Sequence, residues 1–322
     1  MKGTLIERAS SFLQYEILGK IKELSRLCLY DSHDIEQTIL FVGSARSGTT
    51  WISNLINYDN AYRYIFEPFN IHKVKEAKVF KYANQYIRPT DDNMLYLQMM
   101  ERILSGRIHQ NSWTNMYNSR IIADKRIIKG IRCHLYLKWL HDHFPTIPIV
   151  YLMRHPCAAS FSKTKLSHWW SGEENILSFL LDQTELVQDH LEPHLGVIRS
   201  AETLFEQHVT MWAVQNYLVL KQMQAEDYKI VFYEDFCLEP QKAIGDLFSY
   251  LKRPVTEKVY EVYDKGFITR KDSAIEKGED IVRSWMKQIS PEETKYAIRI
   301  IREFGLDEYY DESPYPKKSL FL

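Results

Sequence analysis

The chain has 322 residues, of which 45% are hydrophobic and 26% are charged, a composition typical of a folded globular protein with a large core. Its 41 lysines and arginines nearly balance 42 aspartates and glutamates, and the formal net charge is −1, so the sequence does not favour nucleic acid as a partner. An anionic ligand would have to be bound by a local arrangement of charges.

The four cysteines lie far apart in the sequence, and none forms a Cys-x-x-Cys pair: Cys28, Cys133, Cys157 and Cys237. This spacing fits reduced thiols better than a disulfide framework or a zinc site. The sequence also lacks an uninterrupted apolar leader and a membrane span. We therefore expect a cytoplasmic protein without a membrane anchor.

The first 36 residues carry apolar side chains at helical spacing, and we expect them to form an amphipathic helical extension. The apolar stripe consists of Leu13, Ile17, Ile21, Leu24 and Cys28. Such a helix can pack over a sheet, which is the commoner case, or it can contact a membrane surface or a second copy of the chain. We expect the main domain to cover residues 37–310 and a tail to cover residues 311–322.

Residues 38–56 predict a buried strand, a loop of small residues and a helix. The loop is bounded by Gly43 and Gly48. A loop of this kind directs free backbone N–H groups and the positive end of the helix dipole towards one point, which favours a phosphate. It is similar to the phosphate loop of nucleoside-triphosphate enzymes, but Thr49 stands where that loop carries a lysine, and the basic residue Arg46 lies earlier.

The run S-A-R-S-G-T-T-W, from Ser44 to Trp51, resembles the 5′-phosphosulfate loop of sulfotransferases that use 3′-phosphoadenosine 5′-phosphosulfate (PAPS). The usual form of that loop is P-[KR]-[SA]-G-T-T-W, and Ala45 replaces the common proline. The resemblance implies that five consecutive residues hold the 5′-phosphosulfate: Arg46, Ser47, Gly48, Thr49 and Thr50. It also implies an adenine contact for Trp51. An ordinary strand–turn–helix with glycines at the turn is the alternative.

Glu67 is the candidate general base. An acceptor hydroxyl is a poor nucleophile until its proton is withdrawn, and a carboxylate placed among Phe66, Pro68 and Phe69 would lose solvation and become a stronger base. Sulfotransferases of the carbohydrate and protein-tyrosine groups place a glutamate at a similar distance from the loop, so the resemblance implies that Glu67 takes the acceptor proton. A helix-cap or surface carboxylate is the alternative.

Residues 71–120 mix lysines with aromatic residues, and their periodicity is poor. We expect loops and helices that cover the acceptor side. Aromatic faces can bind a sugar or an aromatic acceptor, although such residues more often belong to the core. The aromatic residues here include Tyr82, Tyr86, Tyr96, Trp113 and Tyr117. The expected acceptor is a glycan or glycolipid first, and a small metabolite or lipid alcohol second.

A second strand is predicted at residues 126–131, with Lys129 near its C-terminal end, where ligands gather in open α/β sheets. The resemblance implies that Lys129 neutralises charge on the leaving phosphate, and a solvated lysine is the alternative. Phenol and steroid sulfotransferases read K-T-H-L here and use the histidine as the base. This chain reads K-G-I-R-C-H-L, so His134 is displaced from that position and stands as the second candidate base.

A third strand is predicted at residues 147–153, and it leads into R-H-P-C-A-A-S-F-S, from Arg154 to Ser162. This run resembles the family's 3′-phosphate motif, R-[DNH]-P-x5-S, which implies that Arg154 and Ser162 hold the 3′-phosphate of the donor. Arginine suits that role because its planar fork bonds two phosphate oxygens and stays charged. The alternative is a strand-to-helix turn with Arg154 in a salt bridge.

The last motifs follow a strand predicted at residues 229–233. The Y-E-D run there implies that Tyr233 helps to hold the adenine. The pairs Lys277-Gly278 and Arg283-Ser284 resemble the C-terminal segment that closes over PAPS, which implies a donor contact for Arg283 and a leaving-group role for Ser284. A lid is expected physically because it excludes water from a reactive sulfuryl group.

The predicted fold is α/β, with a P-loop-like central parallel sheet flanked by helices on both faces, in a single domain with helical insertions. The resemblance implies sulfuryl transfer from PAPS to an acceptor hydroxyl, or as a second choice to an amine, with adenosine 3′,5′-bisphosphate (PAP) as the product and no metal. His141-Asp142-His143 has the spacing of two metal ligands but no clear third one. A nucleotide-dependent phosphotransferase and a non-catalytic binder stay open as other classes.

Overall fold

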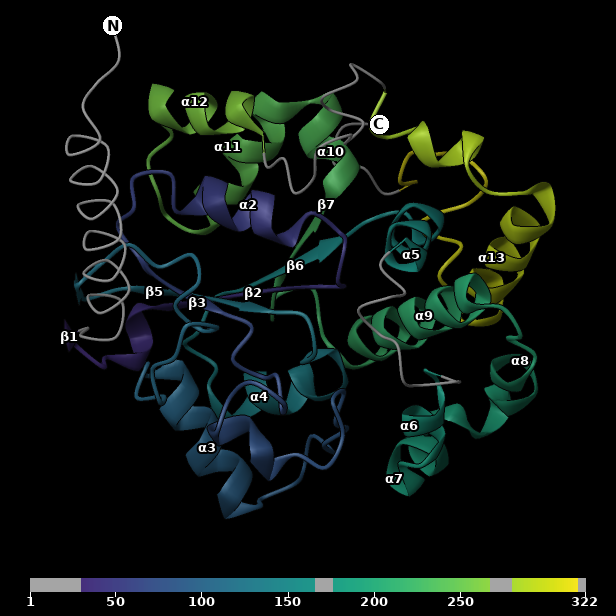
Figure 1. Cartoon of the computed structure of the whole chain (residues 1–322), viewed down its shortest axis with the longest axis horizontal. Coiled ribbons are helices and arrows are strands. Elements are labelled where there is room, and N and C mark those ends of the chain that lie inside the picture. Colours follow the sequence, from purple (N-terminus) through teal and green to yellow (C-terminus); the bar gives the residue numbers. More distant parts are fainter. Residues whose placement is uncertain (1–29, 166–175, 267–279, 318–322) are drawn as a thin grey trace, which may run out of the picture.

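The computed structural model describes residues 30–165, 176–266 and 280–317. Five parallel strands form the central sheet in the order β3-β5-β2-β6-β7 (Figure 1). Their bounds are β2 Thr38–Gly43, β3 Arg63–Phe66, β5 Arg126–Gly130, β6 Ile149–Met153 and β7 Lys229–Phe232. The chain enters the sheet at its centre, and the strand order reverses at β2, which is where open α/β sheets bind ligands.

The sheet is covered on both faces, as the continuous apolar runs predicted. Along β2, Leu40 and Val42 belong to one buried cluster, whereas Ile39 and Phe41 belong to the other. This alternation follows from the two-residue period of a strand. The predicted α/β architecture with a buried parallel sheet is therefore confirmed.

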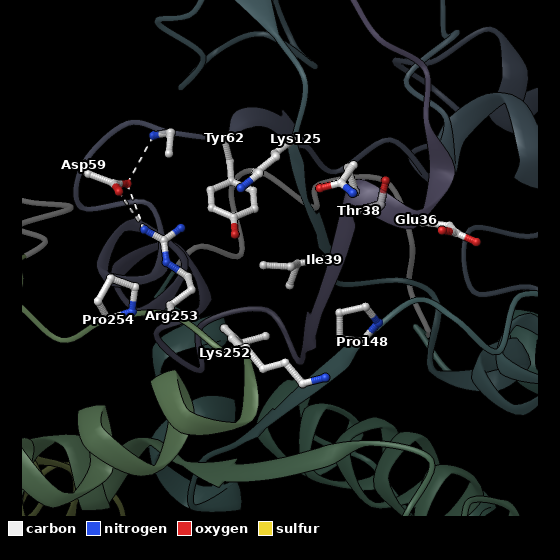
Figure 2. A pocket seen from close by; sticks show the side chains of 13 residues that line it. Glu36, Thr38, Ile39, Asp59, Tyr62, Lys125, Pro148, Lys252, Arg253 and Pro254 are labelled. Carbon is white, nitrogen blue, oxygen red and sulfur yellow. Dashed lines mark hydrogen bonds and ion pairs between the residues drawn. The ribbon is translucent and has the colours of Figure 1, made fainter.

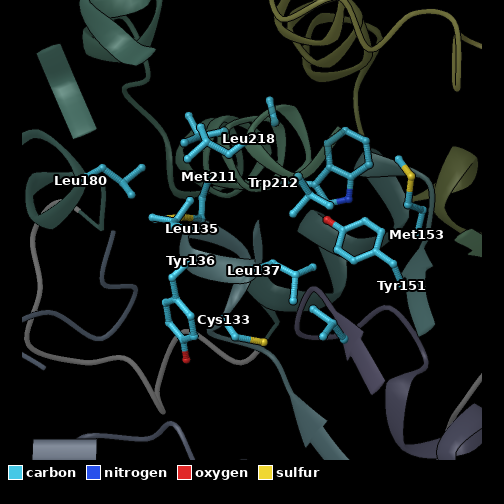
Figure 3. Packing of buried hydrophobic residues seen from close by; sticks show 14 of the residues in the cluster. Cys133, Leu135, Tyr136, Leu137, Tyr151, Met153, Leu180, Met211, Trp212 and Leu218 are labelled. Atoms are coloured by element: carbon cyan, nitrogen blue, oxygen red, sulfur yellow. The ribbon is translucent and has the colours of Figure 1, made fainter. Parts of the chain in front are cut away.

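One face packs against α9 and its neighbours, and Figure 3 shows part of this cluster, with Leu137, Tyr151 and Trp212. A capping box of Thr203 and Glu206 begins α9 and satisfies its first N–H groups. The helices of this side are α3 Met94–Leu104, α4 Leu137–His143, α5 Pro156–Thr164, α9 Leu204–Gln222 and α13 Pro291–Glu303. Shorter segments join them: η2 Glu76–Val79, η3 His134–Tyr136, α6 Ser178–Leu181, α7 Thr184–Leu186, η5 Val187–Leu191, η6 Glu192–His194, α8 Leu195–Arg199 and η7 Ser284–Lys287.

The other face packs against α2, which carries Ile52, Leu55 and Ile56 into the second cluster. Three further helices lie on this side: α10 Tyr233–Leu238, α11 Pro240–Tyr250 and α12 Glu257–Lys265 (Figure 1). The α2 helix, Thr49–Ile56, starts directly at the end of the glycine-bounded loop. Its buried stripe fixes the direction of the helix, and so fixes where the helix N-terminus points.

The N-terminal edge of the sheet is closed by a buried charge cluster. Arg63 and Arg126 are fully buried at the starts of β3 and β5, and both donate to the Asp31 carboxylate, Arg63 at 2.8 Å. Arg63 also donates to the Gly106 carbonyl at 2.8 Å. These ion pairs hold the chain segment before β2 against the N-terminal ends of β3 and β5.

The prediction of an N-terminal helix was wrong for residues 30–36. Residues 30–36 were expected to continue a helix, but Tyr30–Asp31 form β1, which pairs with β4 Ile122–Ala123, and Ile35–Gln37 form the 3-10 helix η1 capped by Asp34. Residues 1–29, which carry the rest of the expected extension, lie outside the described residues. Within the described ranges, the helices are all too short or too polar to cross a bilayer.

Candidate active site

The predicted phosphate loop joins β2 to α2 at the C-terminal edge of the sheet. Gly48 caps α2 with a φ of +87°, and a Cβ added there would lie 2.4 Å from the Tyr233 ring, so both the backbone conformation and the contact require glycine. The N–H groups of Thr49 and Thr50, in the first turn of α2, have no intrahelical acceptor, as in any helix. The loop therefore presents free donors and a helix dipole at the centre of the sheet.

Arg46 connects the loop to the second predicted anion-binding motif. Its backbone adopts a left-handed conformation, with a φ of +68°, and its Nε donates to Ser162 Oγ at 3.0 Å. Arg154 in turn donates from a terminal nitrogen to the Arg46 carbonyl oxygen at 3.0 Å. The two motifs follow the neighbouring strands β2 and β6, so the sheet brings them together at one edge.

Aromatic rings surround the same point. The Arg154 guanidinium lies over the Tyr233 ring, 4.1 Å from its centroid, and the ring is also packed against Gly48. The Trp51 ring meets the Tyr233 ring edge-on, with centroids 5.6 Å apart, and it lies at a tilt to the Tyr263 ring, with centroids 5.4 Å apart. Tyr233 is thus largely enclosed by protein, whereas Trp51 is half-buried.

Several buried donors on these motifs have no partner among the described residues, including Ser47 Oγ, Trp51 Nε1 and Arg154 Nε. A buried polar atom without a hydrogen bond is costly unless a ligand or water satisfies it. A hydroxyl, an indole N–H and a guanidinium N–H beside a helix N-terminus are suited to a phosphorylated ligand with an aromatic base. The residues present therefore fit the donor nucleotide that the sequence implied.

Glu67 follows β3 with a left-handed φ of +43°, and it is 7% exposed. Its carboxylate accepts hydrogen bonds from Lys129 Nζ at 2.9 Å and from Arg132 at 3.0 Å. Its backbone N–H donates to the Lys129 carbonyl at 3.0 Å. The expected carboxylate among aromatic residues is therefore buried, but two cations pair with it.

Lys129 joins this cluster to the loop. Burial lowers the pKa of Lys129, while the Glu67 carboxylate acts in the opposite direction, and the charges of Arg132 and Arg46 lower it further. The ammonium group also lies 4.3 Å from the centroid of the Phe66 ring. Lys129 of β5 pairs with Phe41 of β2, two residues before Gly43, so the Glu67 cluster and the loop lie at the same edge of the sheet.

Two aromatic residues of the 71–120 segment pack beside Glu67. Trp113 and Tyr117 both meet the Phe66 ring edge-on, at 5.1 and 5.0 Å, and Trp113 Nε1 donates to the Glu67 carbonyl at 3.3 Å. Tyr117 is 37% exposed. We call Phe66, Trp113 and Tyr117 the aromatic wall, and it leaves an aromatic surface accessible next to the candidate base.

His134, the second candidate base, lies elsewhere. Its ring meets Tyr151 of β6 at 5.8 Å, it is 1% exposed, and neither ring nitrogen has a hydrogen-bond partner among the described residues. Burial, with a contribution from the charge of Lys163, lowers the pKa of His134 to about 3. The imidazole is therefore neutral at physiological pH and enclosed by protein.

The C-terminal motif is placed only in part. Trp285 of η7 stacks on His155 at 4.4 Å, directly after Arg154, so this segment lies beside the 3′-phosphate motif. Ser284 Oγ donates to the Ile281 carbonyl, and Arg283 donates to the Tyr315 hydroxyl at 2.9 Å. Lys277 and Gly278 lie outside the described residues.

Sequence reasoning missed Arg132, which holds Glu67, and Tyr263, which packs on Trp51. The only available signal for Arg132 was its place three residues after Lys129. The two histidines of the H-x-H run have different partners: His141 pairs with Asp227 at 3.1 Å, and His143 contacts the Trp139 carbonyl at 2.8 Å.

A cavity of about 350 Å³ lies at the opposite edge of the sheet (Figure 2). Its lining includes Thr38, Lys125 and Pro148, which stand at or just before the starts of β2, β5 and β6. Strands of this length place the two edges roughly 15 Å apart. The cavity is therefore separate from the candidate site.

Comparison with known proteins gives a family match and several structural likenesses. A family model described as "Sulfotransferase family" matches residues 38–257. The sulfotransferase domain from the curacin biosynthetic pathway is 15% identical, with a TM-score of 0.47, covering 83% of this chain and 97% of that chain. The mouse sulfotransferase SULT7A1 complexed with PAP is 14% identical, with a TM-score of 0.47 and coverage of 90% and 94%. Retinol dehydratase in complex with androsterone and PAP is 15% identical, with a TM-score of 0.43 and coverage of 84% and 80%. No curated protein matches the sequence.

Proposed function

Because this chain belongs to the sulfotransferase family, we propose that it transfers a sulfuryl group from PAPS to an acceptor hydroxyl and releases PAP. The observation that carries this proposal is the contact between the two anion-binding motifs. Arg46 donates to Ser162, and Arg154 donates to the Arg46 carbonyl, each at 3.0 Å. Such closeness supports binding of the 5′ and 3′ ends of one adenosine bisphosphate by the two motifs.

In this proposal the donor is bound along the loop. The residues from Arg46 to Thr50 hold the 5′-phosphosulfate through backbone N–H groups, the two threonine hydroxyls and one guanidinium. Arg154 and Ser162 hold the 3′-phosphate. Trp51 contacts the adenine, with Tyr233 behind it. Preorganised donors of this kind can stabilise the transferring group without a metal.

Glu67 is proposed to withdraw the acceptor proton, and Lys129 to neutralise charge that develops on the leaving phosphate. The ion pair between them supports this division, because it holds Lys129 beside Glu67 at the end of β5, and β5 pairs with β2, which leads into the loop. Each carboxylate oxygen keeps lone pairs beyond the one that its cation uses, so Glu67 can still accept a proton. The same pairing holds both side chains in place before the acceptor binds.

Arg283 and Ser284 are proposed to contact the donor from the C-terminal segment. Their neighbour Trp285 stacks on His155, which supports a position close to Arg154. A segment placed there would exclude water from the donor side of the site, which protects a sulfuryl group from hydrolysis.

The proposed acceptor is a glycan or glycolipid, with a small metabolite or lipid alcohol as the second choice. The aromatic wall supports this choice, because sugar C–H surfaces and apolar rings both pack on exposed aromatic faces. A phosphotransferase is the other candidate reaction. It is disfavoured because Thr49 stands where a triphosphate loop needs its lysine.

The test is transfer of label from ³⁵S-PAPS to a panel of glycans, glycolipids, phenols and lipid alcohols, with γ-³²P-ATP and magnesium in a parallel series. We expect ³⁵S-labelled product from at least one hydroxyl acceptor and no ³²P-labelled product. Phosphoryl transfer from ATP without sulfuryl transfer would contradict the proposal. Truncation of the aromatic wall by Tyr117→Ala should raise KM for the acceptor and leave KM for PAPS unchanged.

A further inference from the structure

Lys163 is a buried lysine close to the loop that the proposed mechanism does not use. It lies near the end of α5, directly after Ser162, and it is 6% exposed. Its Nζ donates to Ser44 Oγ at 3.0 Å, and Ser44 is the first residue of the loop after Gly43. Within residues 30–165, 176–266 and 280–317, no carboxylate lies within ion-pair distance of Lys163.

Two buried histidines interact electrostatically with Lys163: His208 of α9 and His134 of η3. Burial and the charge of Lys163 lower the pKa of each histidine to about 3. Gln215 of α9 accepts a hydrogen bond from Ser44 Oγ at 3.1 Å, so the amide faces the hydroxyl rather than the ammonium.

A buried ammonium group without a carboxylate partner is costly, and the cost falls when an anion is bound nearby. Burial accordingly lowers the pKa of Lys163 to about 8. The place for a nearby anion is the loop itself, because Lys163 hydrogen-bonds its first residue and Arg46 bonds the adjacent Ser162. The charge therefore lies beside the proposed position of the 5′-phosphosulfate.

We propose that Lys163 is a positioning residue of the donor site, whose buried positive charge acts through Ser44 to hold the loop in the form that binds a dianionic phosphosulfate. Lys163 thus provides a positive charge that triphosphate loops obtain from the lysine at the position of Thr49. This inference rests on the proposed function. The competing explanation is purely structural: Lys163 ties α5 to the loop, and its charge has no part in donor binding.

Proton uptake distinguishes the two explanations when the natural protein is compared with variants of Lys163. PAP is titrated calorimetrically near pH 8 in buffers of different ionisation enthalpy. A bound anion raises the pKa of Lys163 from about 8, so the enzyme should take up a fraction of a proton on binding. His134 and His208 do not titrate at this pH, and Arg46 stays charged. Lys129, the other buried lysine of the site, is present in every variant.

The variants separate the charge from the packing. Lys163→Met should weaken PAP binding about tenfold and abolish its share of the proton uptake, whereas Lys163→Arg should keep the affinity within about threefold of the natural protein. Ser44→Ala removes the linking hydroxyl and should weaken PAP binding while proton uptake persists. The matched control is Lys165→Met, which removes an exposed lysine two residues away and should leave the affinity unchanged.

The outcomes distinguish this inference from the proposed function. If the natural protein does not bind PAP, both are wrong. If it binds PAP without proton uptake, and Lys163→Met binds equally well, the inference alone is overturned. If Lys163→Met fails to fold, Lys163→Arg decides the matter, because it keeps the charge but does not titrate near pH 8: reduced proton uptake with retained affinity supports the inference, and unchanged proton uptake overturns it.

Discussion

The two edges of the central sheet both bury positive charge, but they neutralise it differently. At the N-terminal edge, Arg63 and Arg126 converge on the Asp31 carboxylate, and all three side chains are almost completely buried. At the C-terminal edge, Arg46 and Lys163 donate to the hydroxyls of Ser162 and Ser44. The first cluster has its anion built in, whereas the described hydrogen-bond partner of Lys163 at the second edge is a neutral hydroxyl oxygen.

This difference separates a structural role from a binding role. A buried cation that has a protein carboxylate holds two elements together and needs nothing further. A buried cation such as Lys163, which donates to a hydroxyl at the start of a loop before a helix N-terminus, belongs to a site that an external anion completes. Glu67 is the exception at the C-terminal edge, because it carries the chemistry proposed for the acceptor.

The largest effect is expected from Glu67→Gln, which removes the proposed base and keeps the shape of the side chain. Turnover on an identified acceptor should fall about 10²- to 10⁴-fold, because general-base catalysis contributes that range, while the affinity for PAP should not change. The matched control is Glu76→Gln, which alters another buried glutamate side chain, 7% exposed, outside the site. If Glu67→Gln keeps full turnover, the catalytic assignment is wrong.

Asp31→Asn tests the structural edge. The substitution leaves Arg63 and Arg126 buried without their shared anion, and removal of one partner from a buried ion pair costs about 3–5 kcal/mol of unfolding free energy. Urea unfolding measures this loss. The affinity of the folded protein for PAP should be unchanged. A selective loss of PAP binding would contradict a purely structural role for the N-terminal edge.

Glu234 provides a test that depends on pH. Burial raises its pKa to about 7, although hydrogen bonds from the His155 N–H and the Tyr310 hydroxyl oppose the shift. The folded protein therefore binds the proton more tightly than the unfolded chain, so stability should fall as the pH rises from about 4 to about 7. Glu234→Gln lacks this titration. Relative to this variant, the natural protein should lose roughly 2–3 kcal/mol of unfolding free energy across that window. If the unfolding free energies of the two proteins change in parallel with pH, the raised pKa of Glu234 is wrong.

Arg154→Met tests the second anion-binding motif. Loss of a charged hydrogen-bond donor should weaken PAP binding about 10- to 100-fold with little change in stability. Arg253→Met is the matched control, since Arg253 also lies over an aromatic ring, that of Tyr62 at 4.7 Å, but beside the cavity of Figure 2. Equal losses of PAP affinity in both variants would mean that the site has been placed at the wrong edge.

The smallest effect is expected from Gly48→Ala. The left-handed φ and the contact with Tyr233 should cost about 1–2 kcal/mol of folding free energy and weaken PAP binding. Gly245→Ala, in the middle of α11 with open space around its Cβ position, should instead stabilise the protein by about 0.5–1 kcal/mol. A Gly48→Ala variant that matches the natural protein in both stability and PAP affinity would remove the loop's need for glycine.

The long elements of the fold were predictable from the sequence. The strands at β2, β5, β6 and β7 were all predicted, because each is a buried run rich in β-branched residues between turn signals. β3 was not predicted as a strand. Its four residues begin with Arg63 and are followed closely by Pro68, so the run is too short and too mixed to be recognised locally.

The motif residues of the candidate site could be selected from the sequence, but the contacts between them could not be predicted. The motif residues Arg46, Arg154 and Ser162 come together because β2 and β6 are neighbours, a fact of the strand order rather than of local sequence. The pairing of Glu67 with Lys129 and Arg132 depends likewise on the adjacency of β3 and β5. Local patterns do not encode such adjacency, so the second cation on Glu67 could not be foreseen.

The central claim is that one edge of the sheet binds a single adenosine bisphosphate between the loop and Arg154. Calorimetric titration of the natural protein with PAP, against ATP with magnesium, tests it most directly. The account predicts saturable one-to-one binding of PAP that needs no metal, and much weaker binding of ATP. Tight binding of ATP with magnesium and no response to PAP would contradict it.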